Sequence, residues 1–233
     1  MQLVNHGVSA SLLEKAKKEI QDFFNLPMEE KKKYWQYPGE QEGFGQAFVL
    51  SEEQKLDWGD LYFMITLPHH FRKPHLFPKL PLSFRDTLEI YALELKNLAI
   101  TILTTWKRHL KWKAEKWRNS LTILLRINEV EGLQIKKDGK WVPIKPLPNA
   151  FIINIGDVLE VITNGVYRSI THRATINSER ERLSIATFYN PKYEGEIGPA
   201  RSLISQQKPA FFKRLGAEEY FEGLFARRLT EKS

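Results

Sequence analysis

The first part of the chain carries apolar residues at helical spacing. Between residues 9 and 27 they recur every three or four positions until Pro27, which predicts a helix. Ser11 with Glu14 three residues later is a capping-box signature, so we expect the helix to begin there. A short charged helix, "MEEKKKYW", and a glycine-containing loop, "QYPGEQEGFGQ", are predicted to follow.

A second, longer apolar stripe predicts a helix from Ser83 onward, with Ser83 and Asp86 as candidate caps. It is preceded by an extended segment, "DWGDLYFMITLP", and by a proline-rich stretch that is typical of irregular backbone. The stripe consists of Phe84, Leu88, Tyr91, Leu95, Leu98 and Ile102, and is continued by Trp106, Leu110 and Trp117. We therefore expect these tryptophans to pack in a core rather than to stack on bases.

After Ser120 the pattern changes to short β-type runs. These are "LTILLRI", "GLQIKK", "KWVPI", "NAFIINIG", "DVLEVIT", "YRSITHRATIN" and "RLSIATFYN", separated by turn sequences such as "KDGK" and "TNG". Short strands at this spacing predict a sandwich or barrel, and the tail "KPAFFKRLGAEEYFEGLFARRL" predicts a return to helix. Only Asn119 and Ser120 separate the helical pattern from the first strand pattern.

The amino-acid composition excludes several classes of function. The 233 residues include no cysteine, which excludes disulfides, zinc fingers and thiol catalysis and fits a reducing compartment. The net charge of +7 is concentrated near residues 107–118, so it is weak evidence for nucleic acid. The sequence contains no apolar run of membrane-spanning length, and its first residues have no secretory signal pattern, although "QLVNHGV" resembles the end of a strand whose beginning is missing.

One histidine lies in a strand-like run beside residues that suit an organic acid. His172 is followed by Arg182 and Ser184 at even spacing, which keeps the three on one face if the chain runs strand, turn, strand. A buried arginine needs an anion, its planar fork matches a carboxylate, and a hydroxyl two residues on can add a third bond. A lone strand histidine is more often a hydrogen-bonded core residue, but this neighbourhood outlines a site for a metal and an organic acid.

Long segments also resemble a known family. "LQIKKDGKWVPIKPLPNAFIINIGDVLEVITNGVYRSITHRATINSERERLSIATFYNP" resembles the second half of the jelly-roll domain of plant 2-oxoglutarate- and Fe(II)-dependent dioxygenases, in the norcoclaurine-synthase-like and O-demethylase-like branch. "QLVNHGVSASLLEKAKKEIQDFFNLPMEEKKKYWQ" and two later segments resemble that family's helical N-terminal region. The resemblance implies an α+β protein with a partial double-stranded β-helix, divided into regions 1–118, 119–192 and 193–233.

The resemblance also implies roles for residues. His172 matches the family's distal iron ligand, and Arg182 with Ser184 matches the Arg-x-Ser pair that holds the distal carboxylate of 2-oxoglutarate. The cofactors would then be Fe(II) and 2-oxoglutarate, with ascorbate in support, and the reaction would hydroxylate or demethylate a small plant metabolite. We expect a cytoplasmic monomer with neither nucleic acid nor a membrane as partner.

The sequence departs from the family at the other metal ligands. The family supplies them as His-x-Asp, yet no histidine here has a carboxylate two residues later, and a "NYYPPCP"-like segment is also absent. The family's "GLTILLQVNEVEGLQ"-like strand appears as "SLTILLRINEVEGLQ" directly after the basic segment, which predicts a deletion between Arg118 and Leu121. Three hypotheses follow: an incomplete sequence of a working dioxygenase, a non-catalytic truncated member or interaction module, and a rebuilt metal site that uses Asp157 or Glu160 with His172.

Overall fold

The computed structural model describes residues 1–37, 40, 42–46, 59–77, 80–110, 121–145, 147–189 and 195–226. Contacts divide the chain into two units. One comprises Met1–Gly7 with Asn97–Ser233, and the other comprises Val8–Lys96. Trp117 and the basic residues predicted around it lie outside the described residues.

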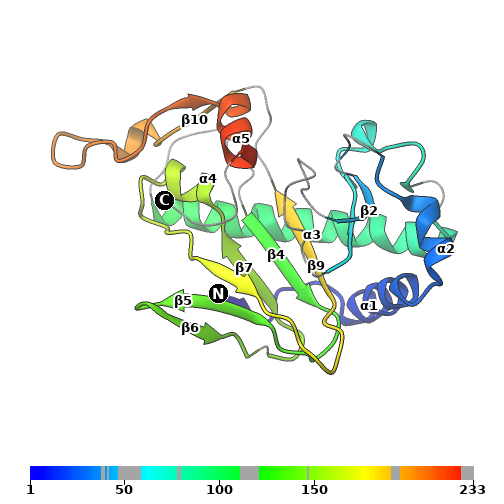
Figure 1. The fold of residues 1–233 in the computed structure, drawn as a ribbon. Coiled ribbons are helices and arrows are strands. Elements are labelled where there is room, and N and C mark those ends of the chain that lie inside the picture. The colour runs from blue at the N-terminus through cyan, green and yellow to red at the C-terminus, as the bar shows by residue number, and fades with distance from the viewer. Residues whose placement is uncertain are drawn as a thin grey trace. The chain divides into compact units, whose positions relative to one another are not determined.

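The unit of Val8–Lys96 is mainly helical (Figure 1). Its elements are α1 (Ala10–Phe24), α2 (Met28–Lys31), η1 (Lys32–Tyr34), β2 (Gly43–Gly45), β3 (Leu61–Phe63), η2 (His69–Phe71) and the first half of α3 (Leu82–His109). Aromatic side chains fill its core: the ring of Phe23 stacks on Tyr62 with centroids 4.7 Å apart, and Phe44 and Phe84 pack around it. This packing explains why the apolar stripes of α1 and α3 are buried.

Three details of this unit differ from the sequence predictions. Helix α1 is capped at Ser9 rather than at Ser11, and no side-chain cap bond forms, because Ser9 and Ser11 contact each other through their hydroxyls at 2.8 Å. Helix α3 starts at Leu82, so Ser83 lies inside the first turn and does not cap it. The predicted loop over residues 36–46 contains strand β2, which pairs with β3.

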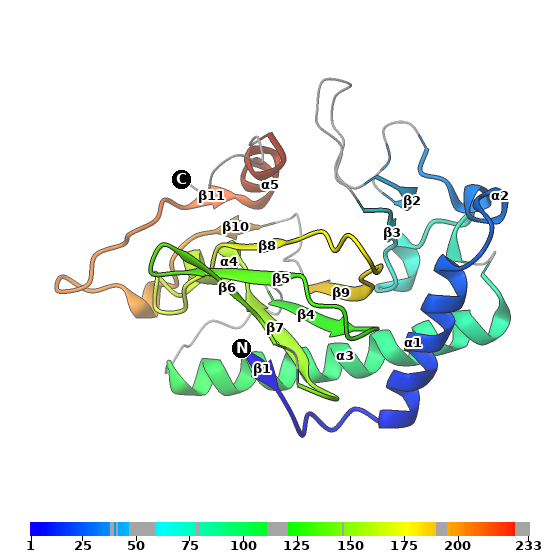
Figure 2. The same cartoon turned by 60° about the horizontal axis from the view of Figure 1, so that its bottom comes forward.

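In the unit of Met1–Gly7 and Asn97–Ser233 the described residues form two antiparallel sheets of three or more strands (Figure 2), and β10 and β11 form a separate antiparallel pair. The larger has the order β1-β7-β4-β9, and the smaller has the order β6-β5-β8. Their strands are β1 (Gln2–Leu3), β4 (Leu121–Arg126), β5 (Leu133–Lys137), β6 (Lys140–Pro143), β7 (Phe151–Ile155), β8 (His172–Ala174) and β9 (Ser184–Tyr189). The unit also holds α4 (Asp157–Ile162), β10 (Glu196–Ile197), η4 (Arg201–Leu203), β11 (Leu215–Gly216) and α5 (Ala217–Ala226).

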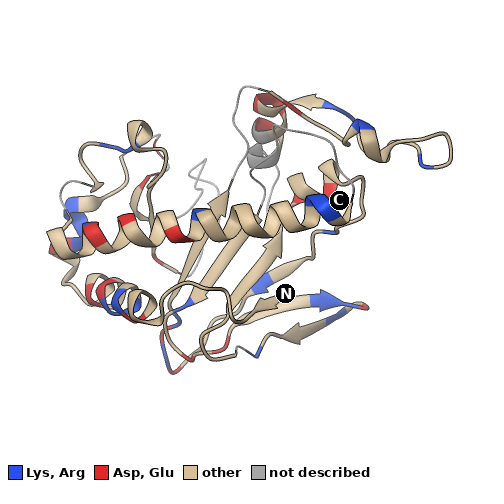
Figure 3. Ribbon diagram, turned by 180° about the vertical axis from the view of Figure 1, so that it is seen from behind, with Lys and Arg blue, Asp and Glu red and all other residues tan. Residues whose placement is uncertain are grey.

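The two faces of the larger sheet contact different parts of this unit. On one face Leu121, Ile123 and Leu125 are fully buried, and the second half of α3 runs across the sheet, as seen from behind in Figure 3. On the other face Leu124 and Ile152 pack against Leu133 of β5, which joins the two sheets. Leu124 therefore lies on the face of the larger sheet that is turned toward the smaller sheet.

One predicted strand is wrong. The run "DVLEVIT" forms helix α4, whose buried residues Val158, Leu159 and Ile162 lie at helical spacing and pack partly against Ile197 and Ala217. Asp157 in its first turn is favoured by the partial positive charge of a helix N-terminus. The other six β-type runs each contain a strand, and the tail contains helix α5.

Trp106 is half-buried near the end of α3 and packs against another aromatic ring, which fits its predicted packing role. Its ring lies 5.0 Å from that of Tyr167 between centroids, and Leu110 packs against the α4 cluster. Lys107 and Arg108 occupy the last turn of α3. Figure 3 shows basic residues in blue at that end of the helix. Within the described residues, no helix combines the length and the apolar character needed to cross a bilayer.

Candidate carboxylate and metal site

The register between β4 and β9 builds one side of the site. Arg126 lies opposite Ser184, Leu124 opposite Ala186, and Thr122 opposite Phe188. Residues directly opposite in an antiparallel pair share a face, so Arg126 and Ser184 project together on the face that carries Leu124. Phe188 on this face is 53% exposed, which leaves the far end of the face open to solvent.

Arg182 lies in the segment just before β9, on the same side of the candidate site as Arg126 and Ser184. Its side chain crosses Gly132, because a Cβ placed on that glycine would lie 2.7 Å from Cδ of Arg182 and 2.9 Å from the carbonyl oxygen of Thr175. The Thr175 N–H donates to the carbonyl of Gly132 at 2.7 Å and holds that backbone in place. Only glycine leaves room for Arg182 to pass at this point.

The two guanidinium groups lie in a partly buried, electropositive setting. Burial lowers the pKa of Arg182, and the positive charge of Arg126 lowers it further. Burial also lowers the pKa of Arg126, against the opposing influence of Glu129 and Glu131. Both glutamates are exposed, and among the described residues neither forms an ion pair with an arginine here.

Several donors of these arginines have no partner among the described residues. Nε and Nη1 of Arg126 and Nε of Arg182 are buried and make no hydrogen bond to the described residues. Unpaired buried donors on two cations match the oxygens of a carboxylate. The arrangement therefore fits the carboxylate group of 2-oxoglutarate, with the Ser184 hydroxyl as a further donor.

His172 belongs to the smaller sheet. It lies opposite Ile135 of β5, on the face of that sheet that carries Leu133 and is turned toward Leu124. Its Nδ1 is 3.1 Å from the carbonyl oxygen of Ile170 and must donate to it, which leaves the lone pair of a neutral ring on Nε2. A metal ligand needs that lone pair.

The geometric premise that linked His172 to the Arg-x-Ser pair is wrong. β8 and β9 do not form a hairpin; β8 pairs with β5, and β9 pairs with β4 in the other sheet. The even spacing between His172 and Ser184 therefore does not determine which face of a sheet each side chain occupies. His172 and Ser184 instead share the space between the sheets because each sheet presents its inner face to the other.

The described residues do not fit an iron centre. They contain no group of three His, Cys, Asp or Glu side chains that could hold a metal ion, and His172 is exposed. Asp157 and Glu160 do not form such a group with His172, so among the described residues the rebuilt site has no support; Oε2 of Glu160 accepts the N–H of Ser169 at 3.0 Å. The carboxylate site has its donors, whereas the metal site has a single candidate ligand.

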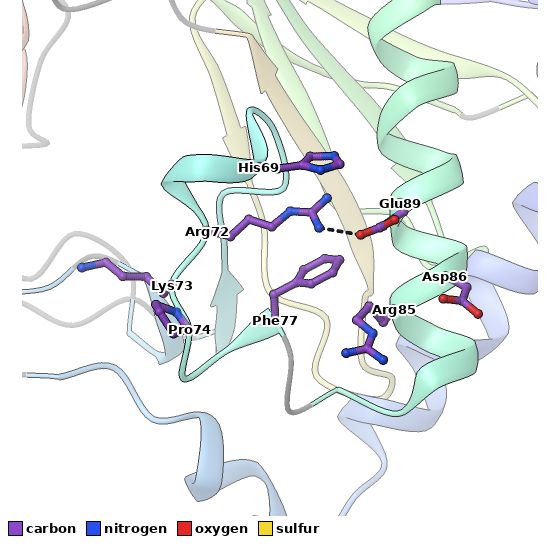
Figure 4. A pocket seen from close by; sticks show the side chains of 8 residues that line it. All are labelled: His69, Arg72, Lys73, Pro74, Phe77, Arg85, Asp86 and Glu89. Carbon is purple, nitrogen blue, oxygen red and sulfur yellow. Dashed lines mark hydrogen bonds and ion pairs between the residues drawn. The ribbon is translucent and has the colours of Figure 1, made fainter.

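A separate hollow of about 570 Å³ lies in the other unit (Figure 4). Arg72 crosses it to pair with Glu89 at 2.5 Å and lies over the ring of Phe77. Lys73 at its edge pairs with Glu40. These pairs engage Arg72, Lys73 and Glu89, and the residues that line the hollow include none of the predicted site residues.

Arg126 was missed by the sequence reasoning, although a signal was present. The family strand "GLTILLQVNEVEGLQ" carries glutamine where this chain has Arg126. A new charge inside a β-type run is unusual unless it has a partner. The missing information was the register that places it opposite Ser184.

Comparisons with known proteins identify the family. Residues 104–191 match the 2OG-Fe(II) oxygenase superfamily, and residues 1–80 match the N-terminal region of non-haem dioxygenases in morphine synthesis. Protein SRG1 from Arabidopsis thaliana is 55% identical over the whole chain and 75% of its own length. The chain belongs to the 2-oxoglutarate- and Fe(II)-dependent oxygenase family.

Two further similarities agree with the predicted branch and fold. Codeine O-demethylase from Papaver somniferum is 47% identical over the whole chain and 74% of its length, so the O-demethylase-like branch is confirmed. The crystal structure of JOX2 in complex with 2OG, Fe and JA superposes with a TM-score of 0.88 at 31% identity, covering 97% of this chain and 78% of that one. The predicted jelly-roll fold is confirmed.

The length of the match carries further information. The alignment with Protein SRG1 runs over 267 residues, although this chain has 233, a difference of 34. The alignment with codeine O-demethylase runs over 266, a difference of 33. Both relatives therefore contain residues inside the matched region that have no counterpart in this oxygenase chain.

Proposed function

We propose that this oxygenase chain retains the 2-oxoglutarate site of its family but lacks the iron centre, so that it binds the cosubstrate without oxidising a substrate. The main support for this proposal is the difference between the carboxylate part and the metal part of the candidate site. Arg182 and Arg126 offer buried donors that have no partner among the described residues, and Ser184 lies opposite Arg126, whereas His172 is the one metal-ligand candidate the sequence reasoning identified and no His-x-Asp occurs in the sequence.

The missing ligands belong, in this proposal, to the residues absent between Arg118 and Leu121. Among the described residues, β8 and β9 each have one paired neighbour and end their sheets. Strands of about five or six residues are typical, so about 30 residues could supply one strand to each edge together with the turns. The sheet edges beside His172 and Ser184 are where such strands would pair.

When iron and 2-oxoglutarate are both bound, the family's chemistry is oxidation of a substrate coupled to decarboxylation of the cosubstrate. In this chain the arginine pair and Ser184 would hold one carboxylate of 2-oxoglutarate, and burial of their nitrogens would limit competition from water. Because the described residues do not fit iron, we assign no oxidation step to this chain.

Titration with Fe(II) under anaerobic conditions, with and without 2-oxoglutarate, tests the proposal. We expect no tight iron site and no succinate release, with 2-oxoglutarate still bound. A matched variant carries the corresponding segment of Protein SRG1 between Arg118 and Leu121; we expect it to gain both iron binding and succinate release. A tight iron site in the unaltered chain that disappears in His172→Ala would overturn the proposal.

A second candidate function is a complete dioxygenase that hydroxylates or demethylates a small plant metabolite. The similarity to codeine O-demethylase and the retained carboxylate donors favour it. It requires that the protein in its source tissue contain the absent segment. Its intact mass would then exceed 27.3 kDa by several kilodaltons; a mass that matches the chain would exclude this candidate.

A further inference from the structure

Arg126 and Ser184 are cross-strand neighbours, and Arg182 approaches both from the segment before β9. The register sets the first pair, and the passage over Gly132 sets the approach of Arg182. Arg126 and Ser184 lie on the inner face of the larger sheet, and the positive charge of Arg126 acts on the Arg182 guanidinium, so the two cations lie within electrostatic reach of each other. Like charges repel, so this arrangement is unfavourable unless an anion lies between or beside them.

The protein itself does not supply that anion within the described residues. Glu129 and Glu131 are the carboxylates whose charge acts on Arg126, but both are exposed and neither forms an ion pair with it. Nε and Nη1 of Arg126 are buried, and no acceptor in the described part of the chain bonds to them. Arg173, by comparison, lies over the ring of Trp141 and donates to Gln134 at 2.9 Å. Arg126 therefore differs from a surface arginine that has local partners.

We propose that Arg126 is a second arginine of the 2-oxoglutarate site, which binds a carboxylate of a dicarboxylate together with Arg182 and Ser184 and needs no metal ion to do so. The proposal rests on the proposed function and adds Arg126 to it. A guanidinium fork pairs with two carboxylate oxygens, and a second fork supplies attraction that a metal would otherwise provide. The ligand class is a dicarboxylate of five carbons.

Calorimetry with the full chain in EDTA tests this inference. We expect 2-oxoglutarate to bind, and glutarate to bind with similar affinity, because glutarate has both carboxylates but no oxo group to help chelate a metal. Arg126→Gln should weaken binding by about tenfold or more, since a charge-assisted bidentate pair is lost. Arg126→Lys should recover part of that loss, because it restores the charge without the fork.

Arg173→Gln is the matched control, because it removes an arginine of the smaller sheet whose partners are Trp141 and Gln134. We expect its affinity to equal that of the unaltered chain. A cooperative thermal transition in each variant shows that a loss of binding is not a loss of folding.

The outcomes separate the inference from the proposed function. If 2-oxoglutarate binds in EDTA and Arg126→Gln binds it equally well, Arg126 is not in the site, while the proposed function stands. If the folded, unaltered chain binds no 2-oxoglutarate with or without metal, the proposed function fails and this inference fails with it. If glutarate binds at least tenfold more weakly than 2-oxoglutarate, the inference that the site recognises its ligand through the carboxylates alone, without a metal, is wrong.

Discussion

The two faces of strand β4 differ in how fully the rest of the protein covers them. Leu121, Ile123 and Leu125 on one face are at most 2% exposed. On the other face the β4–β9 pairs run from Arg126 and Ser184 to Thr122 and Phe188, and Phe188 is 53% exposed. The covered face stabilises the fold, and the open face holds the candidate site, where buried arginine donors have no partner among the described residues.

This difference is the structural basis of our proposal that the chain retains the carboxylate site without the metal site. The carboxylate donors come from two adjacent strands and the segment leading into one of them, so their geometry needs only the β4–β9 pairing. A metal site needs ligands from segments far apart in the sequence, each placed within a fraction of an ångström. A deletion that removes one segment therefore abolishes the metal site first.

The largest expected effect is on the covered face. Ile123→Ala should lower the free energy of unfolding by about 2–5 kcal/mol, because it leaves a cavity at a position with 0% exposure. Urea denaturation measures this change, and Ile123→Val, with an expected loss of about 0.5–1.5 kcal/mol, is the graded control. A loss below that of the valine variant would show that this face is not the stabilising one.

Gly132→Ala should have the next largest effect. Its Cβ would meet both the Arg182 side chain and the backbone oxygen of Thr175, and crowding of this kind costs about 1–3 kcal/mol. The same variant should weaken 2-oxoglutarate binding, because Arg182 must move. Combining it with Arg182→Ala should relieve only part of the destabilisation, since the Thr175 oxygen remains; full relief would mean that the backbone contact is unimportant.

Phe188→Ala should change stability little, although it removes a large aromatic side chain. The residue is 53% exposed on the open face, and we expect a loss of less than about 1 kcal/mol by urea denaturation. A loss as large as that of Ile123→Ala would contradict the proposed difference between the faces.

Tyr189→Phe should have the smallest effect and the opposite sign. The Tyr189 hydroxyl is buried without a partner among the described residues, so its removal should raise stability by up to about 1 kcal/mol. Burial raises the pKa of Tyr189, so above about pH 10 the unfolded chain releases the phenol proton while the folded protein keeps it, and the free energy of unfolding falls as the pH rises further.

Thermal unfolding between pH 8 and 11 measures this effect. The unaltered protein should lose more stability than Tyr189→Phe over the upper part of that range. Equal losses in the two proteins would mean that the hydroxyl has found a partner in solution.

The sequence by itself determined most local structure. Apolar spacing identified the helices α1 and α3 and six strands, because side-chain periodicity reports the face that each element buries. It failed at "DVLEVIT", where β-branched residues at helical spacing fit a helix whose first turn is favoured by Asp157. It also failed at the capping residues of α1, where the two serine hydroxyls contact each other.

Only the tertiary structure decided which strands pair and which side chains meet. His172 and Ser184 lie in different sheets, and spacing along the chain could not reveal that. Arg126 joined the site through its register with Ser184, a contact across 58 positions of sequence. Periodicity is a property of one segment, whereas strand pairing depends on contacts between distant segments, so the residue types of the site were readable and their arrangement was not.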